Sequence, residues 1–587
     1  MYDTLIKGGT VFDGSGGEPM LADIGIKNGY IDAVGPDISG PAVQTIDAEG
    51  AIVTPAWIDI HTHYDGQVTW DSEMNPSASH GVGTIVMGNC GVGFAPVAAG
   101  HEQELIDLME GVEDIPGTAL HEGMPWGTWE SYPEYLDYLA TRKYSLDISS
   151  LVAHGAVRNF VMGERGRTNQ AATDSDLKQM GEIVEEALRA GAVGFSTSRI
   201  LGHRSIQGDP VPGTFANDVE VMAISDALKR AGSGVFQIIP SSTLGPGRPG
   251  MQEHSSLEQE IDLILKVSQS SGRPATFTLF QTHEWTDKWR DALELVRAGN
   301  VNGARVYPQV GSRPTGLVLS MGTYHPWMLK PSYRKLTTLS VSERMVELQK
   351  SDVKRAILSE ANHVDGIPVG SMEFGIAHAE FTWEQAFPLT SNSDYEPHKE
   401  ESFASRAAET NQTPEALLYD YLTAHADHMG IVFFTNYPEF NLDAVREMQM
   451  DDITVTGLSD AGAHVSLIFD AVNPTYQLSY WTRDRTRGEK LPLSHVIYRA
   501  TSRNAQLFGF NDRGLIKAGM RADINVIDYD NIGLGELKVQ HDLPTGGARL
   551  MQPAQGYLAT MIAGEVTRRF DQDTGARPGR LVRGGTR

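Results

Sequence analysis

Residues 52–65 read IVTPAWIDIHTHYD. The run Ile52–Ile60 is almost entirely apolar, so we expect it to form a buried strand. His61 and His63 follow at its end, and because side chains alternate along an extended chain, both imidazoles lie on one face. Two imidazoles on one face can bind a single metal ion. The HxH pattern alone says little in a chain with 18 histidines, so the prediction depends on its position at the strand end.

The fifty residues before this strand are typical of β-structure. The pair Asn28-Gly29 predicts a two-residue hairpin turn between two short apolar runs. Comparable runs return near the C-terminus, first at 522–528. Because both ends are β-rich and flank a different middle, we expect 1–54 and 505–587 to pack together as one small β-sandwich domain.

Short apolar strands alternate with amphipathic helices in the middle of the chain, which indicates a parallel sheet. Further strands are predicted near 83–88, 151–153, 192–196, 235–239, 276–280, 304–307 and 453–458, and helices near 176–189, 218–230, 257–269 and 288–298. This alternation predicts an α/β fold with a TIM-like (β/α)8 barrel over 55–504. Two stretches break the rhythm, at about 95–145 and 310–430, and we expect them to be insertions on the active-site face.

The composition limits the partners. The chain has 587 residues and a net charge of −27, which disfavours nucleic acid and anionic membrane surfaces and leaves a small-molecule substrate as the expected partner. Cys90 is the single cysteine, so an intramolecular disulfide is impossible. With no signal peptide and no apolar stretch of about 18 residues, a cytoplasmic protein is expected. A homo-oligomer is left open.

Two more polar residues end predicted strands. Cys90 stands in GNCG after the second barrel strand, and Asp460 follows a late apolar strand. The last strand of a closed barrel lies beside the first, so Asp460 can face His61 and His63. Thiolate and carboxylate both bind zinc. The alternatives are that Cys90 is a small buried hydrophobe and that Asp460 stabilises a turn.

Taken together, these motifs resemble the amidohydrolase superfamily, and most closely its N-acyl-D-amino-acid deacylases, the D-aminoacylases. The matching stretches are 59–65, 88–91, 153–158, 161–163, 191–197, 459–460, 512–523, 542–544, 556–557 and 574–580. The resemblance implies a TIM-like barrel with a β-sandwich formed by the chain ends. It also implies zinc bound at His61, His63, Cys90 and Asp460, with Asp460 as the general acid and base.

The chain departs from that family at its second metal site. The family carries one metal-binding histidine after the fifth strand and another after the sixth, and neither strand here has one. His283 lies just past the sixth strand and could replace the missing histidine only from a later position, which we do not favour. No lysine stands at the end of a candidate strand to bridge two metals. We therefore expect one zinc ion per chain.

The family's contacts to a substrate carboxylate are also absent. The position of its lysine corresponds to Gln281 or a neighbour, and the arginine that follows its aspartate is replaced in the run that begins at His464. Arg199 and His203, after the fourth strand, are candidate replacements, with a solvated loop as the alternative. His154 and His464 are candidate contacts to the oxyanion or the leaving group, with a structural role as the alternative.

These features predict a metal-dependent hydrolase of linear amides, with N-acyl amino acids as the first substrate to consider. A second hypothesis on the same scaffold is hydrolysis of another amide, a cyclic amide, a carbamate or a lactone. A third is a non-catalytic binding protein on a decayed enzyme scaffold. The third is disfavoured, because nothing structural requires all four metal-ligating residues together.

Overall fold

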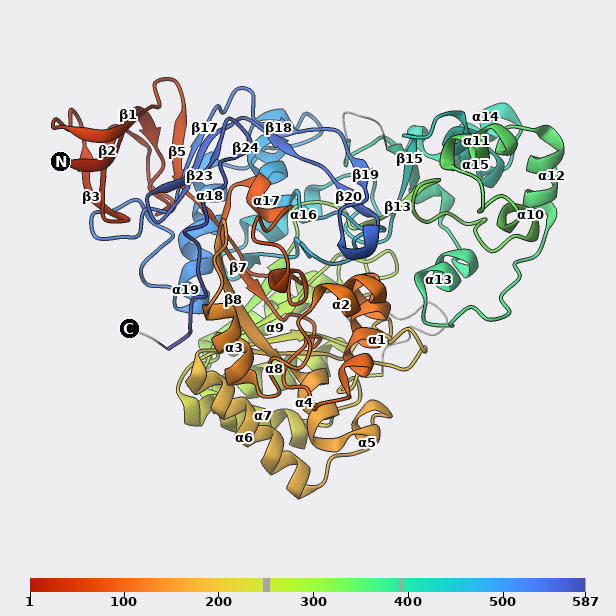
Figure 1. Cartoon of the computed structure of the whole chain (residues 1–587), viewed down its shortest axis with the longest axis horizontal. Helices are drawn as coiled ribbons and strands as arrows, with labels where there is room; N and C mark the ends of the chain where they lie inside the picture. The colour runs from red at the N-terminus through yellow and green to blue at the C-terminus, as the bar shows by residue number, and fades with distance from the viewer. Residues whose placement is uncertain (246–253, 390–393, 586–587) are drawn as a thin grey trace.

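The computed structural model describes residues 1–245, 254–389 and 394–585 (Figure 1). Eight parallel strands form one curled sheet, and each strand pairs with its neighbour in chain order. The strands are β6 (Trp57–Asp59), β7 (Val82–Met87), β8 (Asp147–Ala153), β9 (Gly194–Ser198), β10 (Val235–Ile239), β11 (Ala275–Thr278), β12 (Val306–Val310) and β16 (Val455–Thr456). Nearly every residue in them is buried, as expected for a parallel sheet covered on both faces.

The first and last strands close the sheet into a barrel. Just beyond β6 and β16, Thr62 and Ala461 form a parallel β-bridge. The N–H of Asp460 donates to the carbonyl of His61 at 3.1 Å. Nearer the bottom of the barrel, the amide of Asn504 donates to one carbonyl on each strand, at 2.8 and 2.9 Å. The expected position of Asp460 beside the HxH segment follows from this closure.

Four helices cover the central strands of the barrel: α6 (Asp174–Ala190), α7 (Asp218–Ala231), α8 (Leu257–Ser271) and α9 (Lys288–Val301). Each corresponds to a helix predicted from the sequence. The first turn of α6 is fixed by a capping box between Thr173 and Asp176, and the helix ends at Gly191 with φ 117°. No helix in the described ranges is long and apolar enough to cross a membrane.

Both chain ends contribute strands to one nine-stranded sheet, which has its own apolar core. Its strands are β1 (Tyr2–Val11), β2 (Met20–Lys27), β3 (Tyr30–Gly35), β4 (Ala42–Asp47), β5 (Ile52–Pro55), β17 (Ile524–Ile527), β22 (Tyr557–Ile562), β23 (Glu565–Arg569) and β24 (Gln572–Asp573). The hairpin turn is confirmed, with φ 53° at Asn28 and 80° at Gly29. A barrel with a β-domain from both ends confirms the predicted fold class, and the limits 1–54 and 505–587 stay a prediction.

The single strand predicted over Ile52–Ile60 is in fact two. β5 pairs with β1 and β17 in the end domain, whereas β6 pairs with β7 in the barrel. The chain changes sheets at Ala56, whose N–H donates to the carbonyl of Asp523 at 2.9 Å. Both halves are equally apolar because each lies in a hydrophobic core, so hydrophobicity gives no signal of the break.

Two insertions interrupt the barrel. The first lies between β7 and β8 and contains α1 (Glu102–Glu113), α2 (Gly117–Gly123) and α3 (Tyr132–Ala140). The second lies between β12 and β16 and includes the antiparallel strands β13 (Gly316–Ser320), β14 (Ala386–Leu389) and β15 (Met429–Phe433). It has its own core around Trp327, Leu348 and Tyr419, and it projects to the right of the barrel in Figure 1.

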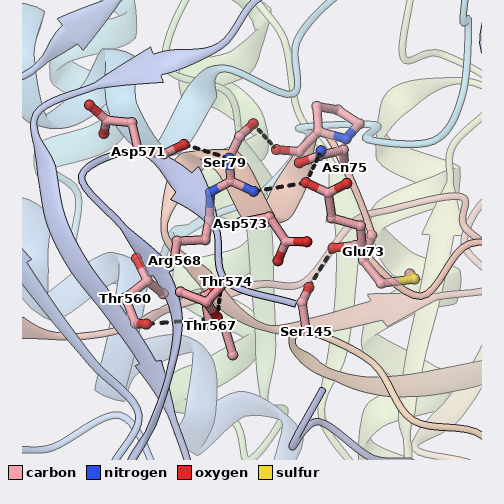
Figure 2. Close-up of polar contacts among 12 residues, drawn as sticks. Glu73, Asn75, Ser79, Ser145, Thr560, Thr567, Arg568, Asp571, Asp573 and Thr574 are labelled. Carbon is pink, nitrogen blue, oxygen red and sulfur yellow. Dashed lines mark hydrogen bonds and ion pairs between the residues drawn. The ribbon is translucent and has the colours of Figure 1, made fainter. Parts of the chain in front are cut away.

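Polar contacts join the end domain to the barrel (Figure 2). Arg568, on β23, donates to Glu73 in the loop after β6 at 3.0 Å and to the carbonyl of Asp571 at 2.6 Å. The amide of Asn75 donates to the same oxygen of Glu73 at 2.7 Å, and the hydroxyl of Ser145 donates to the Glu73 carbonyl. The loop that follows the HxH segment is therefore held by the C-terminal strands.

A buried ion cluster makes a second connection. Asp147, at the start of β8, bonds Arg513 at 2.6 Å and Arg521 at 3.0 Å, and all three side chains are at most 4% exposed. Asp147→Asn should destabilise the chain by at most about 3–5 kcal/mol, because two buried guanidinium groups lose one charge partner while Asp523 still pairs with both. Denaturant unfolding measures this. The matched control is Asp137→Asn, since Asp137 is 74% exposed in its ion pair, and equal effects of the two changes would contradict the prediction.

Candidate metal centre

The four predicted ligands converge at the mouth of the barrel. Nε2 of His61 lies 3.2 Å from Sγ of Cys90 and 3.3 Å from Oδ1 of Asp460. Nε2 of His63 lies 3.7 Å from each of the same two atoms. His61 and His63 follow β6, Cys90 follows β7 and Asp460 follows β16, so three strand ends supply the four donor atoms.

These spacings fit zinc. With bonds of 2.0–2.3 Å, ligand atoms at the corners of a tetrahedron lie about 3.3–3.6 Å apart. The four measured contacts run from 3.2 to 3.7 Å. Over the described ranges, His61, His63 and Cys90 are the one group of histidine, cysteine or acidic residues that meets metal-ligand spacing. Thiolate with imidazole favours zinc among the common metals.

Two residues that the sequence analysis did not single out lie beside the Nδ1 atoms of the two imidazoles. Nδ1 of His61 lies 2.8 Å from Oε1 of Gln309, and Nδ1 of His63 lies 3.2 Å from Oε1 of Glu113. An acceptor at Nδ1 keeps the ring proton there and leaves Nε2 free for a metal. Gln309 is a polar residue just before the end of β12, and its place near a strand end could have marked it as a candidate site residue. Glu113 belongs to the first insertion, and no barrel periodicity points to it.

The backbone around the centre is strained. Cys90, Leu458, Asp460 and His464 have φ values of 57°, 63°, 46° and 49°, in the left-handed region that side chains other than glycine seldom adopt. Strain of this kind persists where the surrounding structure enforces it, and it concentrates at functional sites. Three of these four residues were predicted from the sequence to belong to the site.

In the metal-free protein, burial is the largest influence on the pKa values of the predicted ligands. It lowers the pKa of His61 to about 4 and raises the pKa of the Cys90 thiol to about 12. Burial alone would also raise the pKa of Asp460, but His61 and His63 outweigh it and hold that pKa well below its ordinary value. Cys90 therefore stays a neutral thiol at neutral pH unless a cation binds, since a coordinated thiol is deprotonated.

His464 and His203 lie near this cluster. Nε2 of His464 is 3.5 Å from Oε2 of Glu113, and its side chain is 18% exposed. Nδ1 of His203 is 3.0 Å from the hydroxyl of Ser198. Burial, and after it the nearby His464, lower the pKa of His203 to about 3. Both imidazoles thus belong to the electrostatic environment of the four predicted ligands, and their substrate contacts stay predictions.

Two other predicted residues have their partners inside the protein. His154 is buried, and its ring nitrogens lie 2.8 Å from the hydroxyl of Thr197 and 2.9 Å from Glu220. Arg199 is buried too, and its Nε donates to both oxygens of Glu260 at 3.0 and 3.1 Å. The alternative that Arg199 belongs to a solvated loop is therefore wrong for its side chain, which is buried. A substrate carboxylate would have to separate Arg199 from Glu260.

Gln281, at or next to the position of the family's carboxylate-binding lysine, is a neutral amide. The amide of Gln281 donates to the carbonyl of Thr286 at 3.2 Å and to Glu439 at 3.3 Å. His283 is not part of the group that meets metal-ligand spacing among the described residues. Among the residues that the structure describes, one set of candidate ligands meets at the mouth of the barrel.

A closed parallel barrel with imidazole, thiolate and carboxylate donors at its mouth defines the class of metal-dependent barrel hydrolases. The amidohydrolase family model matches residues 44–568. The chain belongs to this family. It is therefore an enzyme, a metal-dependent hydrolase of carbon–nitrogen bonds other than peptide bonds, which decides against the non-catalytic alternative.

Two curated relatives come from Alcaligenes xylosoxydans xylosoxydans. The chain is 24% identical to its N-acyl-D-aspartate deacylase over 99% of this chain and 95% of that protein. It is 36% identical to its D-aminoacylase over 197 residues, which are 33% of this chain and 37% of that protein. The solved N-acyl-D-glutamate deacylase of Bordetella bronchiseptica, complexed with zinc and a phosphonate inhibitor, superposes with a TM-score of 0.64, at 21% identity and over 99% of each chain. This last likeness shows the fold.

If Cys90 is a ligand, Cys90→Ala should lose most of its bound metal together with its activity, because one of four donors is removed. Elemental analysis of the purified variant measures this. Val92→Ala is the matched control, since Val92 is buried in the same loop but offers no donor atom. A Cys90→Ala protein that keeps its metal and most of its rate would make Cys90 a packing residue.

Proposed function

We propose that this enzyme hydrolyses linear amides, with N-acyl amino acids as its first substrate class, and that it uses one zinc ion per chain. The observation that carries the proposal is the convergence of His61, His63, Cys90 and Asp460 at tetrahedral spacing. The names of the relatives, which are deacylases of N-acyl-D-amino acids, support the substrate class. The same names favour the D-enantiomer.

Zinc held by His61, His63, Cys90 and Asp460 would polarise the scissile carbonyl and make water a stronger acid. Asp460 accepts a proton from the attacking water and then delivers it to the leaving nitrogen. His61 and His63 hold the pKa of Asp460 well below its ordinary value, so the carboxylate is ionised at neutral pH. The same low pKa makes it a weak base, so the proton transfer depends on the metal making the water more acidic. Water enters from the open side, where the Asp460 side chain is 21% exposed while both ligand histidines are 1% exposed.

The nearby arginines keep a second candidate open. Arg199 is bound to Glu260. Arg313, three residues beyond β12, is bound to Asp470 at 2.7 Å and stacks on Tyr395 at 3.9 Å from the ring centroid. Because both cations already have a carboxylate partner, a substrate with no free carboxylate also fits. The alternative is therefore another amide, a cyclic amide, a carbamate or a lactone.

Metal analysis and a substrate panel test the proposal together. We expect one equivalent of zinc, because the described residues assemble one set of ligands. We also expect N-acyl amino acids, presented as both enantiomers, to be cleaved faster than a hydantoin, a carbamate or a lactone. Two tightly held zinc ions would disprove the single-metal part, and a faster reaction with any of the other three classes would overturn the substrate class.

Asp460→Asn tests the proton transfer. Asparagine keeps the size of the residue and still offers an oxygen to the metal, but it cannot accept and return a proton. The kcat should fall by about 10²–10⁴ while most zinc remains and KM changes little. Steady-state kinetics and zinc analysis on one preparation measure both. A near wild-type rate would remove Asp460 from proton transfer and direct the search to His154, His203 and His464.

A further inference from the structure

A buried carboxylate from the first insertion lies between two imidazoles of the metal centre. Glu113 is the last residue of α1, and its side chain is 1% exposed. Its Oε1 is 3.2 Å from Nδ1 of His63, and its Oε2 is 3.5 Å from Nε2 of His464. Within the described part of the chain, neither carboxylate oxygen nor Nδ1 of His63 makes a hydrogen bond of regular geometry.

A carboxylate in this environment requires a partner. Removing it from water costs several kcal/mol unless nearby charges or donors compensate. No arginine or lysine bonds Glu113 among the described side chains, so the two imidazoles are its compensation. When His63 gives Nε2 to a metal, its proton must sit on Nδ1, where Oε1 of Glu113 accepts it.

Glu113 is not placed to bind the metal itself. Nε2 of His63 faces Cys90 and Asp460, whereas Glu113 contacts Nδ1 on the other side of the same ring. The imidazole therefore separates the carboxylate from the donor cluster. This arrangement matches the carboxylate–histidine–metal relay that orients ligands in many zinc proteins.

The backbone next to Glu113 is joined to the loop that carries Asp460. The Glu113 carbonyl accepts the N–H of His464, and Oδ2 of Asp114 accepts the N–H of Ser466 at 3.0 Å. Asp114 ends the helix with φ 54°, and its Oδ1 accepts the hydroxyl of Tyr324, in the second insertion, at 2.7 Å. The end of α1 is thus hydrogen-bonded both to the loop that carries Asp460 and to the second insertion.

We propose that Glu113 is a positioning residue that fixes His63 as a zinc ligand and His464 beside the reacting groups. The first insertion then contributes to the metal centre through Glu113, in addition to packing beside the barrel. This inference rests on the proposed zinc centre. It assigns to Glu113 an effect on zinc affinity that a purely packing role does not predict.

The test is the zinc affinity of the full-length protein after removal of its metal, measured by competition with a chromophoric chelator. Glu113→Gln keeps the shape of the residue and removes its charge, and zinc should bind about 10–100-fold more weakly. Glu113→Asp should fall between this variant and the wild type. Glu110→Gln is the control, because Glu110 is a partly buried acid on the same helix that bonds the backbone of Gly117 instead of a metal ligand.

The outcomes separate the two proposals. If wild-type protein fails to bind zinc, the metal centre itself is wrong. If wild type binds zinc and Glu113→Gln binds it equally well, the positioning role is overturned, even if the metal-free variant melts at a lower temperature, since that pattern is structural. Should Glu113→Gln not fold, Glu113→Asp decides, and unchanged zinc affinity in that variant overturns the role.

Discussion

Closure of the barrel is the constraint on which the proposed metal centre depends, because its predicted ligands come from strands at opposite ends of the barrel sequence. β6 brings His61 and His63 to the mouth, and β16 brings Asp460 beside them. The hydroxyl of Ser459 bonds Asp59 at 2.5 Å and the carbonyl of His61 at 3.1 Å, which ties the two strand ends side chain to backbone. Asp59 is buried, and burial raises the pKa of its carboxyl to about 7.

The sequence predicted the elements that depend on local patterns, which are the apolar strands, the amphipathic helices and the polar residues at strand ends. Strand ends in a parallel barrel share one face, so polar residues that follow apolar runs, such as Cys90 and Asp460, could be grouped from the order of residues alone. Apolar periodicity gave the helix near 176–189, which the structure has as Asp174–Ala190. The split at Ala56 could not be seen, because two hydrophobic cores leave the same pattern in the sequence as one.

Contacts between distant segments were beyond reach for a different reason. The partner of the His63 ring is Glu113. Its position is set by the turn that ends α1 and by its backbone hydrogen bond to the loop that carries Asp460. The partners of Arg199 and His154 are carboxylates on helices α8 and α7. In each case the pairing depends on how an insertion or a covering helix packs, and no spacing in the sequence encodes that distance.

The polar groups on the neighbouring strands bear on the number of metal ions. The N–H of Cys90 donates to Oε1 of Gln237 on β10 at 3.0 Å, and His61 has Gln309 on β12 as its partner. Between them, β11 contributes the buried hydroxyl of Thr278. Amides and hydroxyls are weak zinc ligands beside imidazole and thiolate, but they orient such ligands well. Two imidazoles, one thiolate and one carboxylate already balance the charge of a single Zn²⁺. A second ion beside Cys90 would add two positive charges next to Gln237 and Thr278, which are neutral, and this favours the single-metal centre that we propose.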